Sequence, residues 1–166
     1  MAYRYRRKMT AAERATLAVA AVVAVGATGG AAVHHYHRVS VPAGSAYTQA
    51  SWARALLRAD SDPRTRCNLD GVTAWERAEG GHFANAARYN PLDSTMREPG
   101  SWSMNPVGVQ AYPSWRAGFR ATLATLHNGL YGNVLAALRA GDSAQAIADA
   151  VAASPWGTQP FTARCA

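Results

Sequence analysis

The stretch Asn68-Leu69-Asp70-Gly71-Val72-Thr73-Ala74-Trp75-Glu76-Arg77-Ala78-Glu79-Gly80-Gly81 decides the fold. Its apolar side chains recur every three or four residues, the spacing that gathers them on one face of an α-helix. The pattern predicts a helix over 69–79, with Asn68 as its N-cap and the glycine pair as its end. Glu76 and Glu79 lie on the same stripe, so two carboxyl groups share the apolar face.

Further helical patterns flank this stretch on both sides. They run over 49–58, 114–128, 133–140 and 143–153. The segment 82–113 is rich in Asn, Gly, Pro and Ser, which predicts long loops with a short hairpin. We expect Asp142 to cap the last helix and Trp156 to pack back onto the core. The predicted fold class is therefore mostly α, a small helical domain with long cleft-lining loops.

The 166 residues divide into an N-terminal arm and one domain. A basic segment, 1–14, precedes an uncharged and mostly apolar run over 15–33, the order found in a signal peptide. This run reaches the roughly 20 apolar residues of a membrane span only by including its glycines, so a cleaved signal and a single membrane anchor both stay open. A linker over 34–45 then leads to the domain, 46–166. The basic flank predicts that this domain lies outside the cytoplasm, either secreted or anchored to the cell membrane.

Most of the positive charge belongs to the N-terminal arm. Residues 1–41 hold six basic side chains and one acidic side chain, which leaves +2 of the formal net charge of +7 for the rest. We therefore expect no nucleic-acid binding, because that function requires a basic surface on the domain. His34, His35 and His37 lie in the linker without distant partner ligands, so we predict no metal site and no cofactor. We expect a monomer.

Two cysteines lie near the two ends of the predicted domain. Cys67 and Cys165 form an even set beyond an export signal, which favours a disulfide between them. Such a bridge adds about 4 kcal/mol to stability by the chain-entropy argument. Two free thiols remain the alternative, and neither cysteine lies in a nucleophile motif.

Glu79 is the position best suited to chemistry. It lies at the end of the predicted helix, one turn after Trp75 and directly before the glycine pair. Burial and the negative end of the helix dipole both disfavour the carboxylate and raise its pKa. A carboxyl that keeps its proton near neutral pH can protonate a glycosidic oxygen as the bond breaks. A carboxylate that only pairs with an arginine is the alternative, and Glu76 competes for the same role from one turn earlier.

Four segments of the chain resemble a known family when they are taken in order. They are 74–81 (AWERAEGG), 90–95 (NPLDST), 105–112 (NPVGVQAY) and 153–158 (ASPWGT). This order resembles the lysozyme-like domains of actinobacterial and phage cell-wall proteins, which are similar to lytic transglycosylases and goose-type lysozymes. The likeness extends from about residue 48 to about residue 160.

The resemblance implies a role for each of several residues. Glu79 takes the position of the catalytic acid, and Asp93, Glu98 and Glu76 are the candidates for a second acid. The residues implied to contact the substrate are Asn90, Ser94, Thr95, Gln110 and Tyr112. Loop aromatics such as Trp102 could stack on sugar rings, although core packing is the commoner fate of such residues.

The resemblance also implies an activity. We expect an exported enzyme that acts on peptidoglycan and cuts the β-1,4 bond between N-acetylmuramic acid and N-acetylglucosamine. An inverting hydrolase needs a second carboxylate, whereas a transglycosylase can use one Glu twice, and the sequence leaves both mechanisms open. The alternative from another class is a non-catalytic peptidoglycan-binding or envelope-assembly component with a lysozyme-like fold.

Overall fold

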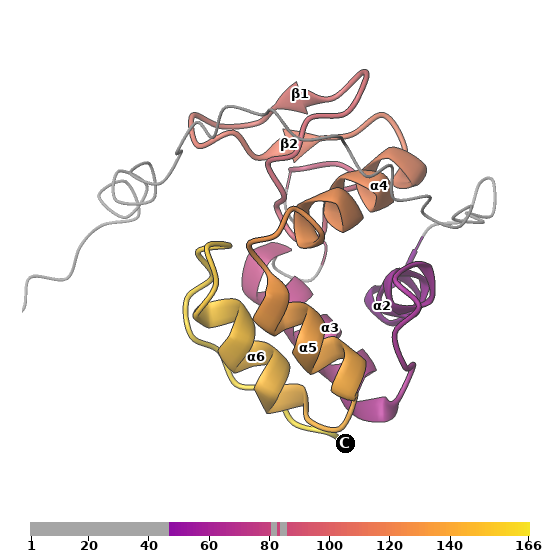
Figure 1. The fold of residues 1–166 in the computed structure, drawn as a ribbon. Helices are drawn as coiled ribbons and strands as arrows, with labels where there is room; N and C mark the ends of the chain where they lie inside the picture. The colour runs from indigo at the N-terminus through magenta and orange to yellow at the C-terminus, as the bar shows by residue number, and fades with distance from the viewer. Residues whose placement is uncertain (1–46, 81–82, 84–85) are drawn as a thin grey trace, which may run out of the picture. The chain divides into compact units, whose positions relative to one another are not determined.

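A computed structural model describes residues 47–80, 83 and 86–166. This part of the chain holds five helices and one two-stranded sheet (Figure 1). In chain order they are α2 (Gln49–Ala59), α3 (Arg66–Gly80), β1 (Trp102–Ser103), β2 (Gln110–Ala111), α4 (Trp115–Leu126), α5 (Gly132–Ala140) and α6 (Ala144–Ala152). The mostly α class and the short hairpin predicted from sequence are confirmed.

The predicted basic segment 1–14, export segment 15–33 and linker 34–45 lie outside the described residues. Within the described part, none of the helices combines the length and the apolar character that a membrane crossing requires. The boundary of the domain at residue 46 stays a prediction.

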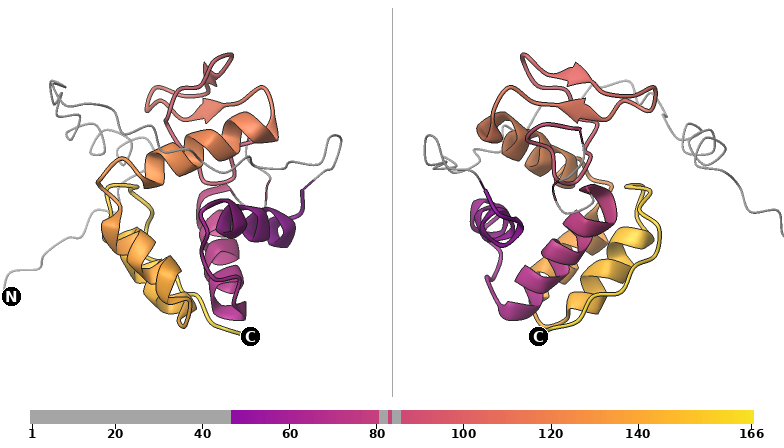
Figure 2. Two further views of the ribbon diagram at one scale, coloured as in Figure 1. Left: turned by 45° about the vertical axis from the view of Figure 1, so that its right-hand side comes forward. Right: turned by 180° about the vertical axis from the view of Figure 1, so that it is seen from behind.

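Helix α3 is the centre of the helical layer. It packs against α2 on one side and against α6 on another, and α6 also packs against α5 (Figure 2). A Cβ atom on Gly71 would lie 2.6 Å from Cδ1 of Ile147 and 3.3 Å from Cα of Ala144. Glycine at this position therefore permits the close approach of α3 and α6. The fully buried core side chains around these helices include Trp52, Leu57, Val72, Trp75, Phe119 and Leu138.

The start of α3 differs from the prediction. The helix begins at Arg66, and Thr65 Oγ1 accepts the backbone N–H of Asn68 at 3.1 Å, so Thr65 fills the capping role that was predicted for Asn68. Asn68 lies inside the helix and is buried. Its Nδ2 donates to Pro63 O at 2.7 Å and to Leu138 O at 2.6 Å, which joins the preceding loop to α5. The prediction failed because the side-chain amide of Asn68 makes a long-range hydrogen bond to α5 and does not cap α3.

Serine caps α4 and α6. The side chain of Ser143 accepts the N–H of Ala146, so Ser143 is the N-cap of α6 and the prediction of Asp142 for that role was wrong. Ser114 caps α4 in the same way, through the N–H of Ala117. The hydroxyl of a serine one residue before a helix accepts a backbone N–H of the first turn, a group that has no partner within the helix.

The hairpin lies over α4 (Figure 1). Its strands are antiparallel, with Trp102 opposite Ala111 and Ser103 opposite Gln110. Tyr112, directly after β2, is fully buried against Ala117 and Ala121 of α4. Small residues on α4 thus make room for one large aromatic ring that fixes the hairpin.

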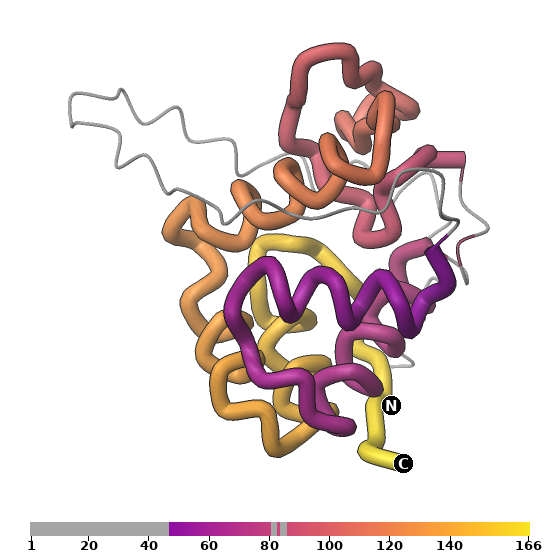
Figure 3. Tube along the Cα trace, turned by 90° about the vertical axis from the view of Figure 1, so that its right-hand side faces the viewer, coloured from indigo at the N-terminus to yellow at the C-terminus, as the bar shows by residue number. Residues whose placement is uncertain are grey.

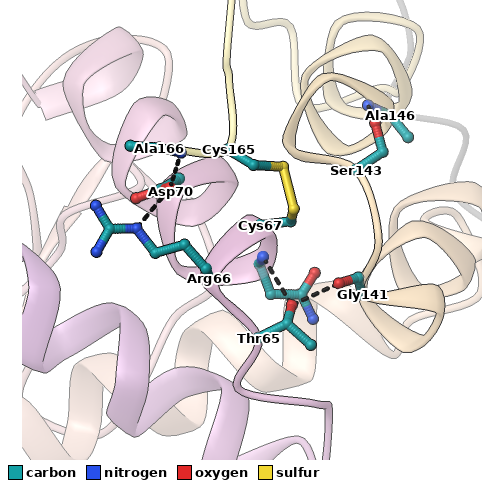
Figure 4. The surroundings of a disulfide bond; sticks show 10 residues. Thr65, Arg66, Cys67, Asp70, Gly141, Ser143, Ala146, Cys165 and Ala166 are labelled. Carbon is teal, nitrogen blue, oxygen red and sulfur yellow. Dashed lines mark hydrogen bonds and ion pairs between the residues drawn. A yellow bond between two sulfur atoms is a disulfide. The ribbon is translucent and has the colours of Figure 1, made fainter.

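The two cysteines form a disulfide between the start of α3 and the C-terminal segment (Figure 4). Cys67 and Cys165 are 98 residues apart in sequence, and the predicted pairing is confirmed. One residue further on, the N–H of Ala166 donates to Asp70 Oδ2 at 2.9 Å. Disulfides persist in oxidising compartments, so this bond supports a location outside the cytoplasm.

Candidate functional site

Glu79 lies where three parts of the domain meet. It belongs to the last turn of α3, which continues through Gly80, one residue past the predicted end. The hydroxyl of Thr158, in the C-terminal segment, donates to Glu79 Oε1. Trp156 of the same segment donates its indole N–H to Leu92 O at 2.8 Å, which ties in the loop that follows α3. Glu79 itself is partly exposed.

The pKa of Glu79 is raised to about 7, and burial is the largest cause. The hydrogen bond from Thr158 opposes the rise, whereas the negative charge of Asp93 contributes to it. The indole N–H of Trp75 also lowers the pKa of Glu79. No hydrogen bond of normal geometry joins this N–H to a described residue. The carboxyl is therefore divided between its protonated and ionised forms near neutral pH, as an acid and base in one reaction requires.

Asp93 is carried by a tight loop with unusual backbone angles. Tyr89 and Asp93 have φ values of 58° and 51°, in the left-handed region that non-glycine residues seldom adopt. Such angles persist only where the surroundings fix them. Asn90 supplies much of that constraint, because its Nδ2 donates to Ser94 O at 2.9 Å and to Gln110 O at 2.7 Å. Its Oδ1 accepts the Ser94 N–H at 2.9 Å.

A glycine of α4 lets the helix lie directly against this loop. A Cβ atom on Gly118 would lie 1.9 Å from the carbonyl oxygen of Tyr89. A side chain of any size at this position would displace the backbone, so Gly118 fixes how closely α4 approaches the loop that carries Asp93.

Four of the predicted substrate-contacting residues are buried and bonded to the loops themselves. Ser94 Oγ and the Tyr112 hydroxyl are 2.7 Å apart, and this hydroxyl also donates to Met96 O at 2.8 Å. Burial raises the pKa of Tyr112 to about 12. Gln110 is buried as well and accepts a hydrogen bond from Ser101 Oγ at 3.0 Å. The buried members of the set are Asn90, Ser94, Gln110 and Tyr112, and only Thr95 is exposed.

These residues thus frame the loops in this structure, and their predicted contact with a substrate stays a prediction. Thr95 is the member of the set that an incoming molecule reaches without a rearrangement of the loops.

The candidates for a second acid occupy three different environments. Glu98 forms an ion pair with Arg120 at 2.6 Å. Glu76 is fully buried, neither of its oxygens has a hydrogen-bond partner among the described residues, and burial raises its pKa to about 9. Asp93 is partly exposed and is the candidate whose charge acts on Glu79.

An open pocket of about 230 Å³ adjoins the loop that carries Asp93. Its walls are Phe83, Ala87, Arg88, Tyr89, Asn90, Pro91 and Trp115. The Arg88 guanidinium lies 5.2 Å from the centre of the Tyr89 ring, and Trp115 packs edge-on against that ring. Trp115 is partly buried against the core, with the remainder of its surface available to this pocket.

Sequence reasoning missed several residues of this region. No motif in the sequence pointed to Arg88 or Phe83. Thr158 was noted only as part of 153–158, one of the four segments that resemble a known family. The packing predicted for Trp156 is confirmed, since its ring lies edge-on against Trp75 with centroids 4.8 Å apart.

Among the described residues, no group of three or more His, Cys, Asp or Glu side chains is arranged to hold a metal ion. Comparison of the chain with protein-family models, with curated proteins and with solved structures finds no match.

Proposed function

We propose that this domain is an exported enzyme that cleaves the glycan strands of peptidoglycan, with Glu79 as general acid and base. The observation that carries the proposal is the partly exposed Glu79 carboxyl, whose pKa is about 7, at the junction of α3, the loop of Asp93 and the C-terminal segment. The resemblance of the segments around these residues to lysozyme-like domains supports the same activity. The disulfide supports the extracytoplasmic location that such a substrate requires.

The proposed reaction begins with proton transfer from Glu79 to the oxygen of the scissile glycosidic bond. Positive charge then develops on the sugar ring, and the Glu79 carboxylate is left as a base. In a transglycosylase this carboxylate removes the proton from a hydroxyl of the same sugar. In a hydrolase a second carboxylate activates water, and we propose Asp93 for this role because its charge acts on Glu79.

The pocket next to the Asp93 loop is the proposed contact with the sugar chain. Sugar rings stack on the faces of aromatic side chains, and Tyr89, Phe83 and Trp115 line this pocket. The guanidinium of Arg88 adds a positive charge at its wall, which suits the carboxylates that peptidoglycan carries.

The test is mass spectrometry of the fragments that the full chain releases from purified peptidoglycan. We expect Glu79→Gln to lower the cleavage rate by about 100-fold or more, because the near-isosteric amide cannot transfer the proton. Glu76→Gln is the matched control, since it makes the same change one turn earlier at a carboxyl that is already neutral, and it should retain activity. Circular dichroism of both variants shows whether the fold is intact.

The ends of the fragments decide between the two mechanisms. Anhydro-sugar ends identify a transglycosylase, and reducing ends identify a hydrolase. Full activity in Glu79→Gln would contradict the assignment of the acid. A folded wild-type protein that sediments with insoluble peptidoglycan and releases no fragments would instead support the alternative, a non-catalytic wall-binding component.

A further inference from the structure

The segment that follows α6 is held at both of its ends. At one end, Trp156 is bonded to Leu92 O and packs against Trp75 and Tyr131, with ring centroids 4.8 and 5.2 Å away. Figure 3 shows the segment, in yellow, returning past the helices to the C-terminus. At the other end, Cys165 is bonded to Cys67 at the start of α3.

Additional contacts hold the segment between these ends. Gln145 of α6 accepts the N–H of Ala163 at 3.0 Å and donates to Phe161 O at 3.4 Å. The N–H of Ala166 donates to Asp70 of α3. The segment is therefore fixed to α3 and α6 along its length, and the position of Thr158 is fixed with it.

Thr158 occupies one defined place in this segment. Gly157 before it has a φ value of 86°, which turns the chain at a point where other residues would be strained. The side chain of Thr158 is buried, and its hydroxyl donates to Glu79 Oε1. This hydrogen bond ties one oxygen of the Glu79 carboxyl to the C-terminal segment.

We propose that Thr158 is a positioning residue, whose hydroxyl holds the Glu79 carboxyl in one orientation and favours its ionised form. The consequence for catalysis rests on the proposed function, whereas the consequence for the protonation of Glu79 does not. A donor to a carboxylate stabilises the charge, and here it opposes both burial and the charge of Asp93. Removal of the hydroxyl takes away the larger of the two opposing effects and leaves only that of Trp75.

The direct test is a carbon-13 NMR titration of the glutamate side-chain carboxyls in the full chain. The Glu79 signal is identified by its loss in Glu79→Gln. We expect Thr158→Val, which removes the hydroxyl and keeps the shape, to raise the titration midpoint of Glu79 by about one pH unit. Thr158→Ser, which retains a hydroxyl, should restore the midpoint. An unchanged midpoint in a folded Thr158→Val protein would overturn the proposal.

Thr162→Val is the matched control, because it makes the same substitution in the same segment at an exposed threonine. It should leave the midpoint of Glu79 unchanged. If Thr158→Val fails to fold, Thr158→Ala removes the same hydroxyl without adding a methyl group and carries the test. A shift of equal size in Thr162→Val would attribute the effect to the segment as a whole and overturn the role of this hydroxyl.

The activity readout separates this inference from the proposed function. A general acid must be protonated to act. A higher titration midpoint for Glu79 therefore shifts the alkaline limb of the pH–rate profile of Thr158→Val to higher pH by the same amount. If no protein in the series cleaves peptidoglycan but the NMR midpoint still rises, the proposed function fails and the positioning role stands. An active wild type with the same alkaline limb in Thr158→Val would overturn the positioning role.

Discussion

Two carboxyl groups with a pKa of about 7 lie at opposite ends of helix α3. Asp62 precedes the helix, and Glu79 belongs to its last turn. Burial is the largest cause of the raised pKa in both cases. For Asp62 the neighbouring Asp60 contributes strongly, because its charge repels a second charge and its carboxylate accepts a hydrogen bond from protonated Asp62.

The surroundings of the two groups give them different chemical uses. Asp62 is 7% exposed and lies near the charge of Arg139, and its partner Asp60 is bonded to His127. The proton of Asp62 is therefore held within a closed pair. Glu79 is partly exposed, so its proton is accessible from outside. A raised pKa alone does not identify a catalytic site, and exposure to solvent is the property that differs between the two groups.

The prediction with the largest expected effect tests whether the carboxyl pair of Asp60 and Asp62, before the start of α3, has a structural role. His127→Ala removes the imidazole that is hydrogen-bonded to Asp60, whose side chain is only 6% exposed. Loss of this partner leaves a buried polar group without its hydrogen bond, and we expect the free energy of unfolding to fall by about 3 kcal/mol in urea denaturation. Cleavage per folded molecule should not change, because this pair lies outside the Glu79 site. A loss of activity that exceeds the loss of folded protein would show that the two ends are coupled.

Gly118→Ala tests the other end of the comparison with a smaller effect. The added methyl group collides with the carbonyl of Tyr89 and forces the Asp93 loop away from α4. We expect a loss of about 1–3 kcal/mol in the free energy of unfolding, since overpacking has this cost. Activity should fall even where the variant is fully folded. Ala121, a buried residue on the same helix, offers the control Ala121→Gly, which adds no atoms against the loop.

A third expected effect concerns pH. The pKa of Asp62 is about 7 in the folded protein and has an ordinary value of 3.8, so the folded state binds more protons between these two values. Stability therefore falls as pH rises from about 4 to about 7, and Asp62→Asn should weaken this dependence within the window. Thermal unfolding at a series of pH values measures the slope. An unchanged slope in Asp62→Asn would mean that the carboxyl pair does not share a proton.

The helices and the hairpin could be predicted because local signals specify them, and the disulfide could be predicted because the chain has two cysteines beyond an export signal. Apolar spacing marks each helix, and the loop composition of 82–113 predicted the hairpin. The caps of α3 and α6 were less predictable, because several polar residues precede each helix and the contacts of the folded chain decide which one is used. Asn68, for example, bonds to Leu138, 70 residues away.

Only the central residue of the candidate site could be predicted from the sequence. Glu79 was evident from its place at the end of an apolar helix face. Thr158 is 79 residues from Glu79, and no local pattern joins the two. The orientation of the polar loop side chains could not be predicted either, because the sequence is the same whether Gln110 and Tyr112 face a cleft or the loops. In the structure both form hydrogen bonds to the loops.

The disulfide also makes most of the domain one covalent ring. Residues 67–165 are closed by the Cys67–Cys165 bond, so a single protease cut between them, for instance in the exposed turn at residues 104–107, opens the ring without releasing a fragment. The cut protein gains the mass of one water and runs as one band until a reductant separates the two pieces. This closure allows the pieces that carry Glu79 and Thr158 to remain parts of one molecule after such a cut.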